Sequence, residues 1–312
     1  MKFAVFGTGA VGGYFGARLA QAGHEVGFIT RPKYLETLVQ NGLSIQSIDG
    51  DFLLHPLRVT DDPAALGPVD CVLVAVKAWQ VEDAARAIKP LIGAHTRVLP
   101  LQNGVEAPRQ LREVLGEKPV LGGLCKIICK VVRPGHLQHS GAEPYIALGE
   151  WDNSRGPSVD SLSTCLSGAG IRCEIPPNIQ VAMWQKFLFI AAFSGVGAVT
   201  RAPIGVIRSL PQTRTMLVEA MAEIDALARV QGLDLGPDIV EKTMAFVDGL
   251  PAHATASMQR DMMEGRPSEL EYQTGSVVRL SRLHQCPCPL NTFIYQALVP
   301  QEQEAGKNTG NP

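Results

Sequence analysis

The sequence has little net charge and no apolar run long enough to span a membrane. Its 28 lysine and arginine residues nearly balance its 30 aspartate and glutamate residues, which leaves a formal net charge of -2. Such a chain has no general electrostatic attraction to nucleic acid or to an anionic membrane. The longest apolar run, 187–199, is shorter than the roughly 20 residues that cross a bilayer. Because the N-terminus also lacks a signal-peptide pattern, we expect a cytoplasmic protein without nucleic-acid or membrane partners.

Cysteine is present, but not in a pattern typical of metal or disulfide sites. Cys125 and Cys129 lack a second pair at matching spacing, and Cys286-Pro-Cys288 is too tight for the usual metal knuckle. The number of cysteines is odd, and they are scattered along the chain. We therefore expect reduced thiols and no bound metal.

The first half of the chain alternates short apolar runs with helical patterns. We expect strands at 2–7, 25–30, 71–76 and 97–101, and helices at 10–21, 32–41, 80–89 and 105–115. This alternation predicts an α/β fold with a Rossmann-like doubly wound sheet. A hairpin that turns at Asp49-Gly50, a β-rich stretch at 121–150, a helix at 158–167 and a strand at 171–175 complete this half.

The second half is predicted to be helical throughout. We expect helices at 179–194, 211–231, 236–248, 252–264 and 269–284. The tail at 301–312 is polar and lacks periodicity, so we expect it to be disordered. A chain of 312 residues is also long for a single core. These observations predict two domains, a nucleotide-binding domain at 1–177 and an all-α domain at 178–312.

A G-x-G-x-x-G motif follows the first expected strand and opens the first expected helix. In that context the pattern is typical of dinucleotide binding, because the glycines allow a tight turn and a close approach of the backbone to a pyrophosphate. The alternative is a glycine-rich turn that only packs closely. The motif residues are Gly7, Thr8, Gly9, Ala10, Val11 and Gly12.

The end of the second expected strand indicates which dinucleotide binds. An NAD-binding protein usually has an acidic residue there, whereas this sequence has Arg31. A guanidinium suits a 2′-phosphate, which favours NADP(H) over a solvated surface arginine. Lys77 and Asn103 follow two later strands, at the sheet edge where ligands of such folds bind, although either could be an ordinary loop residue.

The most apolar helix of the second half contains a single charged residue, Lys186, in the segment 183–193. Lys186, Ile190 and Ser194 are spaced at four-residue intervals and share one helix face. Taken alone, the lysine is more simply read as snorkelling to water.

A second polar group lies at 257–271. Ser268 and Glu271 have capping-box spacing, which would leave Glu269 in the first turn, free to point elsewhere. Ser257 and Asp261 are four residues apart and could share a face. A solvated helical surface is the alternative for each of these residues.

Together these residues resemble the ketopantoate reductase (2-dehydropantoate 2-reductase) family over nearly the whole chain. The matching blocks are GTGAVGG at 7–13, Arg31, KAWQ at 77–80, QNG at 102–104, WQKF at 184–187, SMQRD at 257–261 and EGRPSELEY at 264–272. The resemblance implies an NADPH-binding Rossmann domain, an all-α domain of the 6-phosphogluconate dehydrogenase-like type, and an active site in the cleft between them. It further implies reduction of ketopantoate to pantoate in pantothenate biosynthesis.

The resemblance also implies roles for individual residues. Lys186 matches the general acid and Glu269 the catalytic glutamate, while Lys77 and Asn103 match residues near the nicotinamide and the substrate. Ser257 matches a serine that contacts the substrate carboxylate, and Asp261 has no assigned role. The residues expected to bind substrate are Lys77, Asn103, Lys186, Ile190, Ser194, Ser257 and Glu269.

The sequence departs from the family pattern after the lysine. The family has asparagines at the positions of Ile190 and Ser194, where they bind the hydroxyl and carboxylate end of ketopantoate. An isoleucine removes such a partner, so a paralogue that reduces a more apolar 2-oxo acid is an alternative. A β-hydroxyacid dehydrogenase-like enzyme and a catalytically silent NADP-binding sensor are further alternatives. A homodimer is possible, but no sequence pattern decides it.

Overall fold

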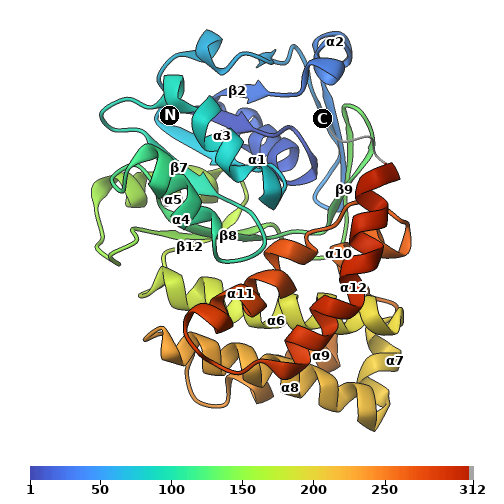
Figure 1. Ribbon diagram of the computed structural model, residues 1–312. Helices are drawn as coiled ribbons and strands as arrows, with labels where there is room; N and C mark the ends of the chain where they lie inside the picture. Colours follow the sequence, from blue (N-terminus) through green and yellow to red (C-terminus); the bar gives the residue numbers. More distant parts are fainter. Residues whose placement is uncertain (309–312) are drawn as a thin grey trace. The chain divides into compact units, whose positions relative to one another are not determined.

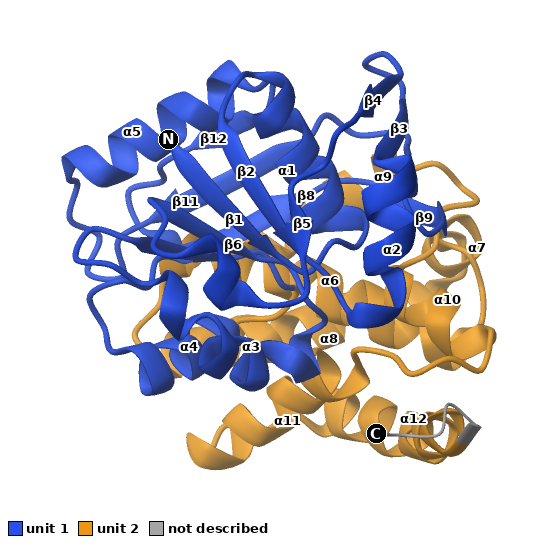
Figure 2. Ribbon diagram, turned by 90° about the horizontal axis from the view of Figure 1, so that it is seen from above, with its two compact units in different colours: residues 1–102, 107–179 blue, residues 103–106, 180–312 orange. Residues whose placement is uncertain are grey.

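The computed structural model describes residues 1–308, which form two compact units. Unit 1 contains residues 1–102 and 107–179, and unit 2 contains residues 103–106 and the chain from Gln180 onward. Figure 2 colours the two units separately. The sequence pattern placed the division after residue 177 and did not separate 103–106 from the first domain. In the structure this short segment, which contains Asn103, belongs with the helices of unit 2.

A five-stranded parallel sheet forms the centre of unit 1. Its strands are β1 (Lys2–Phe6), β2 (Glu25–Ile29), β5 (Val59–Thr60), β6 (Cys71–Val74) and β7 (Arg97–Pro100), in the order β5-β2-β1-β6-β7. The chain adds strands first on one side of β1 and then on the other, so the strand order reverses between β1 and β6. Ligands of such sheets bind outside the carboxyl ends of the strands at this reversal. The predicted doubly wound sheet is confirmed.

Both faces of this sheet are buried, which explains why its strands are continuous apolar runs. Phe3 and Val5 lie in one apolar core, and Ala4 lies in a second core on the other face. The helices of this part are α1 (Ala10–Gln21), α2 (Pro32–Asn41), α3 (Val81–Ala87) and α4 (Ala107–Leu115), with short 3-10 turns η1 (Pro63–Leu66), η2 (Ala78–Gln80) and η3 (Lys89–Leu91) (Figure 1).

Two smaller sheets complete unit 1. Strands β3 (Leu43–Ser47) and β4 (Phe52–Leu54) pair antiparallel, which confirms the predicted hairpin around Asp49-Gly50. They continue into β10 (His136–His139) and β9 (Cys129–Arg133) in the order β4-β3-β10-β9. The other sheet contains β12 (Arg172–Glu174), β11 (Tyr145–Gly149) and β8 (Gly122–Lys126). Helix α5 (Pro157–Gly168) lies between β11 and β12 in the chain and contributes to the same apolar core as β11.

Unit 2 is built from helices. They are α6 (Ile179–Thr200, whose first residue falls in unit 1), α7 (Ile204–Ser209), α8 (Pro211–Val230), α9 (Ile239–Gly249), α10 (Ser257–Met263), α11 (Thr274–Leu283) and α12 (Pro289–Asn308), with a 3-10 turn η4 (Leu270–Tyr272). Helix α6 is long and apolar enough to cross a membrane, but 67% of its most apolar window is buried inside the fold. This burial fits a core helix, since such helices pass the same test of length and composition.

Helix α6 extends past the predicted end at residue 194 because its glycines serve packing and do not end the helix. A Cβ at Gly197 would lie 2.5 Å from Oε1 of Gln259, and a Cβ at Gly195 would lie 3.2 Å from Oγ1 of Thr274. Gln259 is completely buried. The absence of a side chain at these positions therefore lets α10 and α11 pack directly on α6.

The expectation of a disordered tail at 301–312 is wrong for residues 301–308. They continue helix α12, because Glu302 accepts hydrogen bonds from the backbone N–H and the hydroxyl of Ser268, and Ala305 is buried. The backbone bond is 2.8 Å long. Residues 309–312 lie outside the described part of the chain.

The expected capping box between Ser268 and Glu271 is also wrong. The helix of this segment begins at Thr274. The Ser268 hydroxyl donates to Glu302 and accepts a 3.2 Å hydrogen bond from the backbone N–H of Leu270, at the start of η4. The Glu271 carboxylate binds Arg279 and accepts a 2.5 Å hydrogen bond from the Tyr295 hydroxyl. Long-range partners have displaced the local motif.

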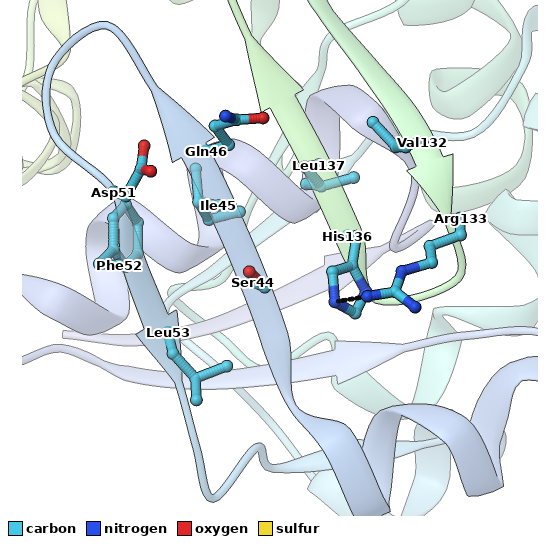
Figure 3. Close-up of a pocket in the computed structure, with 10 residues that line it drawn as sticks. All are labelled: Ser44, Ile45, Gln46, Asp51, Phe52, Leu53, Val132, Arg133, His136 and Leu137. Carbon is cyan, nitrogen blue, oxygen red and sulfur yellow. Dashed lines mark hydrogen bonds between the residues drawn. The ribbon is translucent and has the colours of Figure 1, made fainter.

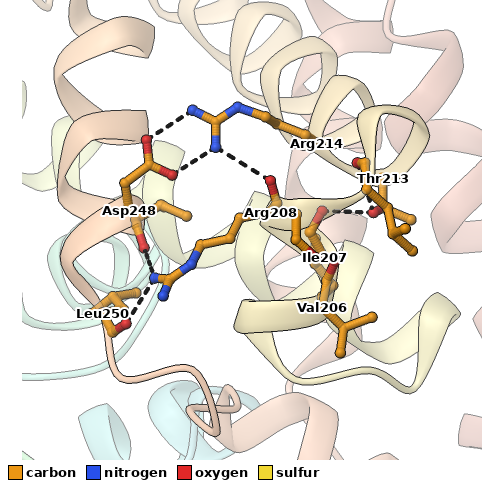
Figure 4. Close-up of polar contacts among 10 residues, drawn as sticks. Val206, Ile207, Arg208, Thr213, Arg214, Asp248 and Leu250 are labelled. Atoms are coloured by element: carbon orange, nitrogen blue, oxygen red, sulfur yellow. Dashed lines mark hydrogen bonds and ion pairs between the residues drawn. The ribbon is translucent and has the colours of Figure 1, made fainter.

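An arginine pair joins α7 and α8 to the end of α9 (Figure 4). Arg208 donates from Nη1 to the carbonyl oxygens of Val247 and Leu250, each at 2.7 Å. Arg214 binds both carboxylate oxygens of Asp248, at 2.6 and 2.8 Å. Carbonyl groups at the end of a helix lack intrahelical partners, so Arg208 caps the C-terminal end of α9.

Candidate active site

The glycine motif forms the tight turn between β1 and α1. Gly7 has φ +104°, and a Cβ there would lie 3.0 Å from backbone atoms of Ala75. A Cβ at Gly12 would lie 2.2 Å from the Gly7 carbonyl oxygen, whereas a Cβ at Gly9 would have nothing within 4 Å. Gly7 and Gly12 are thus required by the fold, while the space above Gly9 is open to a ligand.

The N-terminal end of α1 is suited to a pyrophosphate. Its N-cap residue, Gly9, provides no side-chain cap, and the first turn has no acidic residue. Backbone N–H groups at a helix start attract anions, and the helix dipole adds to this attraction. The turn therefore fits the phosphates of a dinucleotide, which would bind against Gly9, Ala10 and Val11.

Arg31 lies next to this turn at the start of α2. The backbone N–H of Gly7 and the hydroxyl of Thr8 both donate to the Ile29 carbonyl, each at 3.1 Å, and tie the turn to the end of β2. Arg31 follows two residues later, is exposed, and lies over the Tyr34 ring with its guanidinium carbon 5.2 Å from the ring centroid. The position suits a contact with a ribose 2′-phosphate.

Gln102 connects the ends of two neighbouring strands in the same unit. Its side-chain nitrogen donates to the carbonyls of Val74 and Val76, at 2.9 and 3.0 Å. Lys77 comes directly after this segment and is exposed, with its ammonium 5.7 Å from the centroid of the Trp79 ring. Lys77 therefore lies at the carboxyl edge of the sheet, as its sequence position predicts.

Lys186 and Asn103 are brought together in unit 2. The Lys186 ammonium donates a 2.9 Å hydrogen bond to Oδ1 of Asn103, which is 83 residues earlier in the chain. Both side chains are partly buried. The lysine therefore does not simply snorkel, since its ammonium binds a specific amide of the protein.

Glu269 lies in the same unit at the start of η4. It is buried, with 6% of its surface exposed, and its backbone carbonyl accepts hydrogen bonds from Tyr272 and Gln273. A charged residue is almost never buried to this extent unless it is paired. The backbone turn of η4 thus holds the expected catalytic carboxylate.

The other expected substrate residues differ in exposure. Ile190 and Ser257 are partly buried, and Ser257 is the first residue of α10. Ser194 is completely buried, and its hydroxyl has no hydrogen-bond partner among residues 1–308. Asp261 binds the Arg266 guanidinium at 2.7 Å, which gives this acid a structural role in the turn after α10.

The motifs in the sequence did not point to Glu106, a carboxylate three residues after Asn103. Glu106 accepts a hydrogen bond from the Ser276 hydroxyl and another, at 2.6 Å, from Arg279. The available signal was its place two residues after the QNG block. Burial raises the pKa of Tyr295, a neighbour in the same network, to about 12, so this phenol keeps its proton at neutral pH and acts as a hydrogen-bond donor.

A shallow pocket of about 480 Å³ lies elsewhere, on the sheet of β3, β4, β9 and β10 (Figure 3). Its lining includes Ser44, Leu53 and Arg133, and Arg133 contacts His136 at 2.8 Å. None of the predicted site residues lines it. Across residues 1–308, no group of three or more His, Cys, Asp or Glu side chains is placed to hold a metal ion.

Two family models match this chain. Ketopantoate reductase PanE/ApbA matches residues 3–153, and ketopantoate reductase PanE/ApbA C terminal matches residues 178–302. The chain belongs to the ketopantoate reductase family. Ketopantoate reductases are NADPH-dependent oxidoreductases that act on CH–OH groups, and the reaction class of the family is the reduction of a 2-oxo acid.

Individual relatives support this assignment along the whole chain. A 2-dehydropantoate 2-reductase of Nostoc sp. is 30% identical and covers 95% of this chain and 94% of its own. An uncharacterized oxidoreductase of Bacillus subtilis, YkpB, is also 30% identical, over 97% of this chain and 100% of its own. The crystal structure of 2-dehydropantoate 2-reductase from Geobacter metallireducens aligns with a TM-score of 0.90 at 29% identity, over 96% of this chain and 99% of that one. The predicted family, fold class and cofactor are confirmed.

Proposed function

We propose that this ketopantoate reductase family member reduces 2-dehydropantoate (ketopantoate) to pantoate with NADPH, in the cytoplasm, as a step of pantothenate biosynthesis. The observation that carries the proposal is the hydrogen bond between Lys186 and Asn103, which places a partly buried ammonium on a specific amide. A binding module has no need of such a group, whereas a carbonyl reductase needs a proton donor.

In the proposed reaction Lys186 acts on the oxygen of the substrate carbonyl. NADPH, when bound, supplies the hydride that adds to the carbonyl carbon. The developing alkoxide needs a positive charge and a proton, and the Lys186 ammonium provides both. Asn103 accepts a hydrogen bond from that ammonium and so helps to orient it.

Glu269 and Ser257 have supporting roles in this proposal. A buried carboxylate such as Glu269 favours the charged form of a nearby ammonium and can bind a substrate hydroxyl. The Ser257 hydroxyl, at the start of α10, can donate to the substrate carboxylate. Arg31 and the turn of Gly7 to Gly12 would hold NADPH, and Lys77 at the sheet edge completes the polar groups for cofactor and substrate.

A second candidate is the reduction of a more apolar 2-oxo acid. Ile190 lies one turn after Lys186 on α6 and is only partly buried, so it offers a substrate an aliphatic surface in place of a hydrogen bond. A site without a partner for the ketopantoate hydroxyl would favour acids that lack this hydroxyl. The two candidates share the chemistry and differ only in the substrate side chain.

The deciding experiment measures NADPH consumption with ketopantoate and with branched 2-oxo acids that lack the hydroxyl. We expect turnover by the wild type, and a loss of at least about 100-fold in kcat in Lys186→Ala, because removal of a general acid costs about this factor. NADPH binding should be unchanged in this variant. Lys242→Ala, at an exposed lysine of α9, is the matched control. If no 2-oxo acid of the panel supports NADPH consumption by the wild type, the proposal is wrong.

A further inference from the structure

The short segment 103–106, which contains Asn103, is attached to helix α11 of the same unit through the Glu106 carboxylate. Oε2 of Glu106 accepts hydrogen bonds from Ser276 and from Arg279, both on α11. The Glu106 side chain is only 11% exposed, and Ser276 is completely buried. A buried carboxylate that accepts a charge-assisted hydrogen bond is a strong attachment, since such bonds are about twice as strong as neutral ones.

The same arginine reaches the segment that follows Glu269. Arg279 donates from Nη1 to the backbone carbonyl of Glu271 at 3.0 Å and also binds the Glu271 carboxylate. The Tyr295 hydroxyl donates to the other oxygen of that carboxylate at 2.5 Å. The guanidinium thus joins the segment of Asn103 to the turn that starts at Glu269.

The backbone of the segment is fitted closely to this turn. Gly104 has φ +101°, a conformation that favours glycine, and a Cβ there would lie 2.7 Å from the Tyr272 carbonyl oxygen. Asn103 and Glu106 therefore belong to one rigid connection, with the amide at one end and the anchored carboxylate at the other.

We propose that Glu106 is a positioning residue, which holds the Asn103 amide where it fixes the Lys186 ammonium. The inference rests on the proposed function, because it gives Lys186 the role of proton donor. A lysine side chain has four carbons and many rotamers, so its ammonium is placed only by what it binds. A shift of about 1 Å in a reacting group can lower a rate by about 100-fold.

The first experiment does not depend on the substrate. Competitive labelling of lysines, read by mass spectrometry, reports how readily the Lys186 amine reacts in the cofactor-free protein. Loss of its hydrogen bond should raise that rate about three- to tenfold. We expect this rise in Glu106→Gln and in Asn103→Ala, with no further rise in the double variant.

Two internal controls separate positioning from a general loosening of the fold. The labelling rates of Lys242 and Lys77 should stay at their wild-type values in all three variants. Glu113→Gln makes the same chemical change at an exposed ion pair with Arg109 on α4, and it should leave the Lys186 rate unchanged. If Lys186 reacts equally fast in Glu106→Gln and in the wild type, or if all lysines react faster in Glu106→Gln, the inference is overturned.

The second experiment tests the consequence for turnover. Glu106→Gln should lower kcat about 10- to 100-fold while the Kd for NADPH is unchanged. In an Asn103→Ala background the same substitution should have little further effect on kcat, because both substitutions act on the same hydrogen bond between Asn103 and the Lys186 ammonium. Losses that simply multiply in the double variant would contradict a role through Asn103. A wild type that turns over no acid would instead refute the proposed function, and the labelling result would still decide the role of Glu106.

Discussion

Ile190 is the residue at which substrate choice can be tested most directly. It lies one turn after Lys186 on α6 and is partly buried, so an asparagine there would place an amide beside the proposed proton donor. We compare kcat/KM for ketopantoate with kcat/KM for the same acid without its hydroxyl. Ile190→Asn should raise the ratio of the first value to the second by about tenfold or more, since a site that hydrogen-bonds a hydroxyl discriminates strongly in its favour. Steady-state assays with the two acids measure this ratio.

The matched control is Ile190→Leu, which keeps the volume and adds no polar group. It should change both kcat/KM values little and leave their ratio near that of the wild type. If Ile190→Asn alters both acids by the same factor, this position does not contact the part of the substrate that carries the hydroxyl.

From the sequence, roles could be proposed only for residues that lie in a family block. The blocks pointed to Lys186 and Asn103, but not to the 2.9 Å bond between them, which joins positions 83 residues apart. The spacing of Ser268 and Glu271 predicted a reciprocal local cap. The Glu271 carboxylate binds Arg279, and the Ser268 hydroxyl, which accepts from the nearby Leu270 N–H, also binds the distant Glu302. A short motif indicates which hydrogen bonds two residues close in sequence can form with each other. Which distant residues also bind them depends on the fold.

At the scale of elements, the turn between β1 and α1 offers a pair of glycines with opposite roles. A Cβ at Gly12 would lie 2.2 Å from the Gly7 carbonyl oxygen and 2.8 Å from Cβ of Ala75. Gly12→Ala should therefore lower the free energy of unfolding by about 1–3 kcal/mol, as overpacking does. A Cβ at Gly9 would touch no protein atom, and its φ of -89° suits alanine.

Gly9→Ala should accordingly keep the wild-type stability and weaken NADPH binding at least about tenfold, because the methyl group fills the space that the pyrophosphate would use. Urea unfolding and NADPH titration separate the two effects. A Gly9→Ala protein that binds NADPH as tightly as the wild type would show that the pyrophosphate does not approach this turn.

The arginine pair at α9 gives a second element-scale prediction. Arg208→Met removes the guanidinium that donates to the Leu250 carbonyl and to the Val247 carbonyl, which keeps a second donor in the Leu250 N–H, and we expect a loss of about 1–3 kcal/mol in the free energy of unfolding. Arg214→Met breaks an exposed ion pair with Asp248 and should have a smaller effect. Urea unfolding at pH 7 compares the two variants.

The two losses should also differ in their dependence on pH. Hydrogen bonds from Arg214 hold the pKa of the Asp248 carboxyl below its ordinary value of 3.8. The contribution of this pair is therefore present above that value and is lost as the pH falls through the lowered pKa. The deficit of Arg214→Met should shrink in acid more than that of Arg208→Met, because the carbonyl acceptors of Arg208 do not titrate and its charge is the smallest of the causes that lower the pKa of Asp248. Equal shrinkage in both variants would contradict this assignment.

Elements with local signals were predicted well, and those defined by packing were not. Helix α2 begins with Pro32 and ends before Gly42, as its sequence indicates. Helix α6 continues through glycines that normally interrupt helices, because those glycines admit neighbouring side chains. Helix α12 includes a polar C-terminal end, which is held by the hydrogen bond from Ser268 to Glu302 and by the burial of Ala305.

At the scale of the whole molecule, the predicted site residues are divided between the two units. The glycine turn, Arg31 and Lys77 belong to unit 1, and Asn103, Lys186 and Glu269 belong to unit 2. The pattern of strands and helices predicted this division into a nucleotide-binding part and a helical part. It did not assign 103–106 to the helical part, since the hydrogen bonds of Glu106 to α11 link segments 170 residues apart.

This division predicts which substitutions alter cofactor binding. NADPH at 100 times its Kd should raise the free energy of unfolding of the wild type by about 2.7 kcal/mol. Lys186→Ala should keep this gain, because Lys186 belongs to unit 2, whereas the glycine turn expected to bind the cofactor belongs to unit 1. Arg31→Ala should weaken NADPH binding about tenfold or more and leave NADH binding unchanged, since only NADPH has the 2′-phosphate. Arg86→Ala, at an exposed arginine of α3, is the control. Thermal unfolding with each cofactor measures these effects, and equal weakening of NADPH and NADH in Arg31→Ala would exclude a phosphate contact at this arginine.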